Sequence, residues 1–137
     1  MAGQPEARLV ERYLGRMRPA PELIEIDGRK SRDADDEWRR IEARLPDGAA
    51  RVVLDERGRD LTSPDVAARL GRWRDDGRPI ACVIGGAYGL PDAARESADL
   101  LLAFGSATWP HLLVRAMLAE QLYRAQEILA GRPYHHG

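Results

Sequence analysis

Short apolar runs that alternate with helical patterns constrain the fold of this chain most. Branched and other apolar residues gather at residues 23–26, 50–54, 80–84 and 100–104, and we expect a strand at each run. Helical patterns separate most of these runs. Strands that alternate with helices predict an α/β fold, with a parallel sheet covered by helices. The run at 80–84 is apolar throughout, as expected of a strand covered on both faces.

The helices are expected at residues 5–17, 34–45, 63–77, 91–98 and 110–130. The first carries an apolar stripe of Leu9, Tyr13 and Met17, and its Arg stripe at residues 8, 12 and 16 is expected to be solvated. The last is apolar around much of its circumference, which favours packing against a second copy of the chain. Gly131 suits a left-handed C-terminal cap, and Pro133 prevents continuation.

The length of 137 residues suggests a single domain over residues 1–137. A net charge of −1 excludes binding to nucleic acid through bulk charge alone, although all but one of the 21 basic residues are Arg, which binds phosphate well. No membrane span and no secretory signal is visible, so a cytoplasmic location is expected. The single cysteine, Cys82, lies in an apolar run and is expected to be a core residue.

Two loops at predicted strand ends are candidates for ligand binding. Residues 85–89 (GGAYG) lack the spacing of a phosphate-binding loop, so they form either a close backbone approach to a ligand or a tight turn only. Residues 105–111 (GSATWPH) join a strand to the last helix through small residues, either around a ligand or as a connection only. In parallel sheets, ligands bind beyond the carboxyl ends of strands. A flavodoxin-like nucleotide enzyme would need a phosphate loop after its first strand, and none is present.

The tail of the chain, residues 131–137 (GRPYHHG), combines Tyr134 with two histidines. Three His and one Cys in the whole chain supply few ligands, so no metal site is expected. The tail either frays or docks onto the protein.

These motifs together resemble the RlmH-type ribosomal RNA large-subunit methyltransferases of the SPOUT class. The resemblance covers about residues 3–137 and depends on four ordered features. They are the GGxxG turn, the Thr-x-Pro-His helix start at Thr108, the Leu-Tyr-Arg-Ala helix and the Pro-Tyr-His tail. Each feature is weak alone, and their order makes the resemblance specific.

The resemblance implies an α/β trefoil knot near the C-terminus and a homodimer. It also implies methylation of N3 of a pseudouridine in 23S-type large-subunit rRNA on the assembled ribosome, with S-adenosylmethionine as methyl donor. The residues implied to bind this cofactor are Leu54, Gly86, Gly105, Ser106, Ala107, Thr108, Trp109 and Pro110.

The chain departs from the family pattern at two places. Relatives begin with an apolar strand of about seven residues that this sequence lacks before Ala2, so we expect either a misassigned start codon or a truncated variant. A non-catalytic ribosome- or RNA-binding SPOUT protein, inactivated by a shortened N-terminus, is therefore the alternative function. Tyr88 also stands where relatives often carry an acidic residue.

Methylation of N3 requires an acceptor for its proton. His135 is a candidate base, Tyr134 is a candidate to orient it, and Arg115 and Arg124 are candidates to bind phosphate or a carbonyl oxygen of the base. Tyr134, His135 and Arg115 are the expected catalytic residues.

Overall fold

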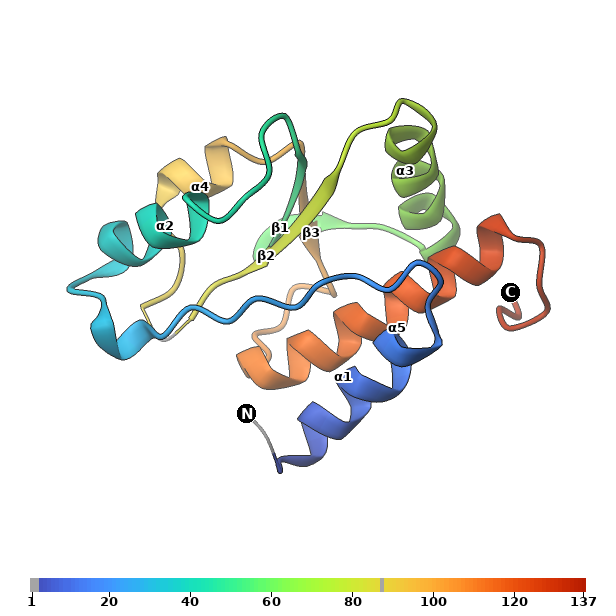
Figure 1. Ribbon diagram of the computed structural model, residues 1–137, viewed down its shortest axis with the longest axis horizontal. Coiled ribbons are helices and arrows are strands. Elements are labelled where there is room, and N and C mark those ends of the chain that lie inside the picture. The colour runs from blue at the N-terminus through green and yellow to red at the C-terminus, as the bar shows by residue number, and fades with distance from the viewer. Residues whose placement is uncertain (1–2, 87) are drawn as a thin grey trace. The chain divides into compact units, whose positions relative to one another are not determined.

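The computed structural model of the protein describes residues 3–86 and 88–137 (Figure 1). The chain forms two compact units. The sheet unit holds residues 24–60 and 73–107, and the helical unit holds residues 3–23, 61–72 and 108–137. Each is described by itself, and the single domain expected from the length stays a prediction. In the described part of the chain, no helix is long and apolar enough to cross a membrane.

The sheet unit is built on three parallel strands in the order β2-β1-β3. The central strand is β1 (Ala50–Asp60), and it lies between β2 (Ile80–Ile84) and β3 (Leu100–Ala103). Val52 and Val53 of β1 are almost fully buried, as branched side chains of a central strand should be. The expected α/β architecture with a parallel sheet is confirmed.

Strand β1 is longer than the sequence predicts and is irregular at its centre. Leu54 and Arg59 both align with Leu102 of β3, so the register shifts across residues 55–58. We expected these residues to close the strand as a turn. Instead, the backbone of β3 passes so close to Gly58 that a Cβ there would lie 2.7 Å from Leu101 and Leu102. The glycine is needed for this close approach.

Two helices pack on the sheet through an apolar cluster. Trp38 of α2 (Ala34–Glu42) and Ala94 of α4 (Asp92–Glu96) are buried together with Val53 and Val83. A short 3-10 turn, η1 (Gly28–Lys30), precedes α2. Strand β2 is confirmed, but it lies at an edge of the sheet and only Val83 is fully buried. The other four residues of this strand are partly buried, so its two faces are covered in part.

The helical unit pairs α1 (Pro5–Arg16) with α5 (His111–Leu129), which lie side by side in Figure 1. Val10 packs against Ala116 and Ala119, whose small side chains let the two helices approach. Helix α3 (Ser63–Asp75) begins in the same unit, and a Cβ on Gly71 would lie 2.8 Å from the side chain of Leu129.

Helix α5 ends as the sequence predicts. Gly131 has a φ of +71°, and its N–H donates to the carbonyl of Ile128 while the N–H of Arg132 donates to that of Glu127. These two bonds form a Schellman cap, which turns the chain sharply at the start of the tail.

The prediction of a strand at residues 23–26 is wrong. The chain has no regular secondary structure there, and the side chain of Leu23 is 50% exposed. A strand requires a hydrogen-bonded neighbour as well as apolar residues.

Candidate functional site

Leu54 and the two candidate loops lie at neighbouring positions of the sheet. Leu54 of β1 aligns with Ile84 of β2 on one side and with Leu102 of β3 on the other. Since Gly86 comes two residues after Ile84 and Gly105 three residues after Leu102, the parallel strands carry both loops toward the same edge of the sheet. The sequence argument from strand ends predicted this placement for the two loops, whereas Leu54 lies inside β1, which continues to Asp60.

The glycine turn, residues 85–89, is held tightly against the sheet unit. Gly89 has a φ of +72° and its N–H donates to the carbonyl of Gly86 over 3.0 Å. A Cβ on Gly85 would lie 2.8 Å from the side chain of Leu90. Ala87 lies outside the described residues. Glycine is therefore required in this turn by close packing and by backbone conformation.

Gly86, an expected cofactor residue, meets a side chain that sequence reasoning missed. Its N–H donates to Oε1 of Glu37 over 3.3 Å. A Cβ on Gly86 would lie 3.0 Å from both carboxyl oxygens of Glu37. The close approach that we expected from a ligand is made here by the protein itself.

The second loop, residues 105–110, is open and contains small residues. Gly105 has a φ of +82°, and a Cβ built on it would meet no other atom within 4 Å. Ser106 and Ala107 are exposed. The remaining expected cofactor residues, Thr108, Trp109 and Pro110, begin the helical unit, where Pro110 precedes α5.

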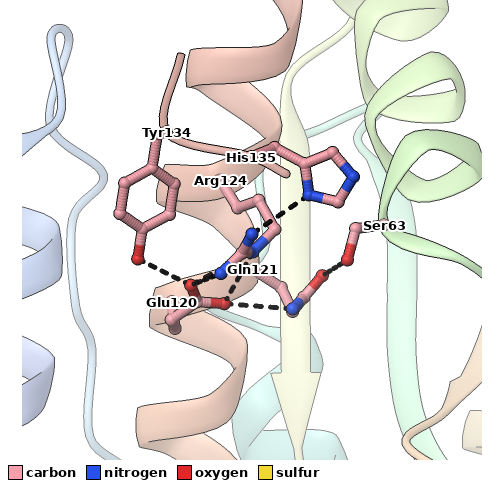
Figure 2. Close-up of polar contacts among 6 residues, drawn as sticks. All are labelled: Ser63, Glu120, Gln121, Arg124, Tyr134 and His135. Carbon is pink, nitrogen blue, oxygen red and sulfur yellow. Dashed lines mark hydrogen bonds and ion pairs between the residues drawn. The ribbon is translucent and has the colours of Figure 1, made fainter. Parts of the chain in front are cut away.

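A second group of polar residues gathers around the tail in the helical unit (Figure 2). We call it the tail cluster, and its members are Ser63, Glu120, Gln121, Arg124, Tyr134 and His135. The carboxyl group of Glu120 is the centre of the cluster. Its Oε2 lies 2.6 Å from Nη2 of Arg124 and accepts a hydrogen bond from the Tyr134 hydroxyl over 2.8 Å. Its Oε1 accepts a hydrogen bond from the Gln121 amide over 3.0 Å. The tail docks, which the sequence left open.

The tail cluster shifts the pKa values of Glu120 and Tyr134 in opposite directions. Burial alone would raise the pKa of Glu120, but hydrogen bonds from Arg124 and Tyr134 outweigh it and lower this pKa below its ordinary value of 4.5. Burial and the hydrogen bond to Glu120 raise the pKa of Tyr134 to about 12. At neutral pH, Glu120 is therefore a carboxylate and Tyr134 a phenol that donates to it.

His135 is oriented by Arg124. An Nη1 hydrogen of Arg124 points to Nδ1 of His135, and the nitrogen atoms lie 3.0 Å apart. Because a guanidinium only donates, Nδ1 accepts, and the neutral ring carries its proton on Nε2. Nε2 is buried and has no hydrogen-bond partner among the described residues. Buried polar atoms of this kind call for an explanation.

Aromatic contacts and a second carboxylate support the tail cluster. The ring of Tyr134 meets that of Tyr123 edge to face, with centroids 4.7 Å apart, and the Arg124 guanidinium lies 4.8 Å from the Tyr134 ring centroid. Buried Glu127 accepts from the Tyr123 hydroxyl over 2.7 Å and from Arg132 over 2.8 Å. These contacts fix the direction of the tail after the Schellman cap.

Of the expected catalytic residues, the structure brings Tyr134 and His135 into one cluster with Arg124. Arg115 lies on the same helix, nine residues before Arg124, and is not among the six members. Sequence reasoning missed Glu120, although its spacing of four residues from Arg124 is a recognisable helical ion-pair pattern. Cys82, expected in the core, is partly buried in β2, and desolvation raises the pKa of its thiol to about 12.

Comparisons with known proteins match nearly the whole chain. A family model described as "Predicted SPOUT methyltransferase" matches residues 1–135. Proteins named "Ribosomal RNA large subunit methyltransferase H" are 56% identical in Rhodospirillum centenum and 51% identical in Cereibacter sphaeroides and Paramagnetospirillum magneticum. Each match covers 96% of this chain and 90% of the relative.

Proposed function

The chain belongs to the SPOUT methyltransferase family, and from that premise we propose that it methylates large-subunit ribosomal RNA. The observation that carries the proposal is the identity of half or more with relatives of that printed name, over 96% of this chain. We further propose N3 of a pseudouridine in 23S-type rRNA on the assembled ribosome as the target, and S-adenosylmethionine as the donor.

The residues at the sheet edge fit such a donor. Leu54 supplies an apolar side chain at the position of β1 where β2 ends, and the open loop at 105–107 offers backbone donors and acceptors beside small side chains. A Cβ built on Gly105 would meet no other atom within 4 Å, which leaves space for the donor beside this loop. We propose that Leu54, Gly86 and residues 105–110 hold the cofactor. When bound, S-adenosylmethionine supplies an electrophilic methyl group on a positively charged sulfur.

Methyl transfer of this kind is a single displacement, so alignment is the main contribution of the protein. With the donor bound, the methyl carbon would pass from sulfur to N3, and the sulfur would keep the electron pair of the broken bond. N3 must also give up its proton. We propose that the tail, Tyr134 to Gly137, acts on the target nucleotide during this step.

The tail cluster defines which role His135 can take in its docked position. Arg124 occupies the lone pair of Nδ1 and Nε2 is buried, so neither ring nitrogen of the docked His135 reaches the base. For His135 to accept the N3 proton, its Nδ1 must first leave Arg124. Tyr134 orients the tail through Glu120, and Arg115 is proposed to contact the RNA.

Three further properties complete the proposal. The chain works as a homodimer, its C-terminal part is threaded into a trefoil knot, and the protein acts in the cytoplasm. Much of the circumference of α5 is apolar, which supports a second copy as its partner.

The proposal is tested with purified ribosomes from cells that lack the modification and a methyl-labelled donor. We expect label in large-subunit rRNA at one pseudouridine, located by mass spectrometry of nuclease fragments. Ribosomes that already carry the modification are the control and should take up no label. Binding of ribosomes without label transfer would instead favour the non-catalytic RNA-binding alternative.

A further inference from the structure

Glu37 is a buried carboxyl side chain that the proposed mechanism does not use. It lies on α2, next to the core residue Trp38, and is only 3% exposed. Its neighbours Asp35 and Asp36 share the first turn of the helix but are not buried. Carboxyl groups are rarely buried unless a partner inside the protein replaces their hydrogen bonds to water.

The partner of Glu37 is the glycine turn. Oε1 accepts the N–H of Gly86 over 3.3 Å, and no Arg, Lys or His side chain forms an ion pair with this carboxyl among the residues that the structure describes. On its other side, a Cβ on Gly28 would lie 2.7 Å from Oε2. Two glycines from distant parts of the chain thus leave the space that this carboxyl group fills.

A second contact joins the same two segments. The hydroxyl of Tyr88, in the glycine turn, donates to the carbonyl of Ser31 over 3.1 Å. The segment that holds Ser31 is itself anchored, because Arg40 donates to the Ser31 hydroxyl and to the carbonyl of Asp27. Residues 27–37 therefore form a fixed support behind the turn.

We infer that Glu37 is a positioning residue for the cofactor site: its carboxyl group fixes the Gly86 peptide so that the turn is formed before the cofactor arrives. The inference rests on the proposed function of the turn. At 3% exposure the carboxyl group lies behind the turn and acts through Gly86. A preformed loop loses less conformational entropy on binding, so its ligand binds more tightly.

The test compares Glu37→Ala and Glu37→Gln by calorimetric titration with S-adenosylmethionine and by steady-state methylation of ribosomes. Glu37→Ala should weaken cofactor binding about tenfold, as expected for one lost hydrogen bond to a carboxylate. Its KM for the cofactor should rise by a similar factor while kcat stays within about twofold, because the ground state and the transition state lose the same binding free energy. Glu37→Gln keeps an acceptor oxygen and should bind within about threefold of the parent.

A matched control lies one helical turn and a half further along α2. Glu42 is 44% exposed and pairs with Arg51 over 2.7 Å, away from the glycine turn. Glu42→Ala should leave cofactor affinity unchanged. The same result for Glu37→Ala would overturn the inference, and so would a Gln variant as weak as the Ala variant.

Gly28 provides an independent probe that does not touch Glu37 itself. Gly28→Ala places a methyl group 2.7 Å from Oε2 and should displace the carboxyl group, weakening cofactor binding in the parent. In the Glu37→Ala background the same change should have no further effect, and additive losses would contradict the inference. If Glu37→Ala fails to fold, Gly28→Ala alone tests the contact, and an unchanged cofactor affinity of that variant would overturn the inference.

The failure of this inference is distinguishable from that of the proposed function. A parent that binds S-adenosylmethionine but methylates no rRNA would refute the function, and the affinities would still decide the role of Glu37. A parent with no affinity for S-adenosylmethionine would overturn both.

Discussion

Glu120 concentrates the interactions of the tail on one carboxylate. Arg124 and Tyr134 both contact its Oε2, and Arg124 in turn orients His135. Because the lowered pKa of Glu120 reflects these bonds, ionised Glu120 stabilises the docked tail. A group whose folded-state pKa is depressed contributes this stability fully above its unfolded value, here 4.5, and loses it as the pH falls through the lower folded value.

We therefore expect Glu120→Gln to lower the free energy of unfolding by about 1–2 kcal/mol at pH 7, because hydrogen bonds to a charged acceptor become neutral ones. The difference from the parent should shrink steadily below pH 4.5. Urea denaturation at pH 7 and near pH 3 measures both. Glu11→Gln, at an exposed position of α1, should cost almost nothing at either pH. A penalty for Glu120→Gln that is independent of pH would contradict this account.

At the level of single residues, the sequence could predict groups with visible chemistry but not the residues behind them. Tyr134 and His135 stood out as an aromatic and an imidazole in the tail. Glu37 lies among acidic neighbours, Asp35 and Asp36, and nothing in the spacing distinguishes the buried one from the exposed ones. Its importance comes from the distant glycines 28 and 86, which only the fold brings near.

Among the elements, predictions succeeded where local chemistry decides the structure. Helix α5 and its Schellman cap follow from Gly131 and Pro133 in the sequence. Predictions failed where long-range pairing decides: residues 23–26 have strand-forming side chains but no strand, and β1 continues beyond Leu54 because β3 aligns with it again at Arg59. The knot expected from the family resemblance has no local signal at all.

The tail is the element whose function is tested most directly. Deletion of residues 134–137 should greatly reduce methylation of ribosomes and leave the affinity for S-adenosylmethionine nearly unchanged. Helix α5 should survive the deletion, because its cap ends at Arg132. Label incorporation and calorimetric titration separate the two effects. Full turnover by the shortened protein would refute a role of the tail and direct attention to Arg115 and Arg124.

For the whole molecule, we expect a dimer in which sites are shared between copies. Sedimentation equilibrium should give twice the chain mass of 15.3 kDa.

Gly86→Val should remove cofactor binding, since a side chain there meets Glu37 and distorts the turn. If the tail acts on the partner's site, mixing this variant with the tail deletion should restore up to about a quarter of the parent activity after subunit exchange. No recovery in proven mixed dimers would place the tail and the cofactor of each site on one chain.

The register shift in β1 also bears on how this protein can change in evolution. Leu54 and Arg59 align with the same residue, Leu102, so the ladder with β3 does not set the number of residues between them. We therefore expect insertions and deletions at residues 56–57 to be tolerated, whereas Asp55 is held by its ion pair with Arg95. Gly58 has no such freedom, because any side chain there would collide with the backbone of β3. Among related sequences, we therefore expect β1 to vary in length and yet to keep glycine at position 58.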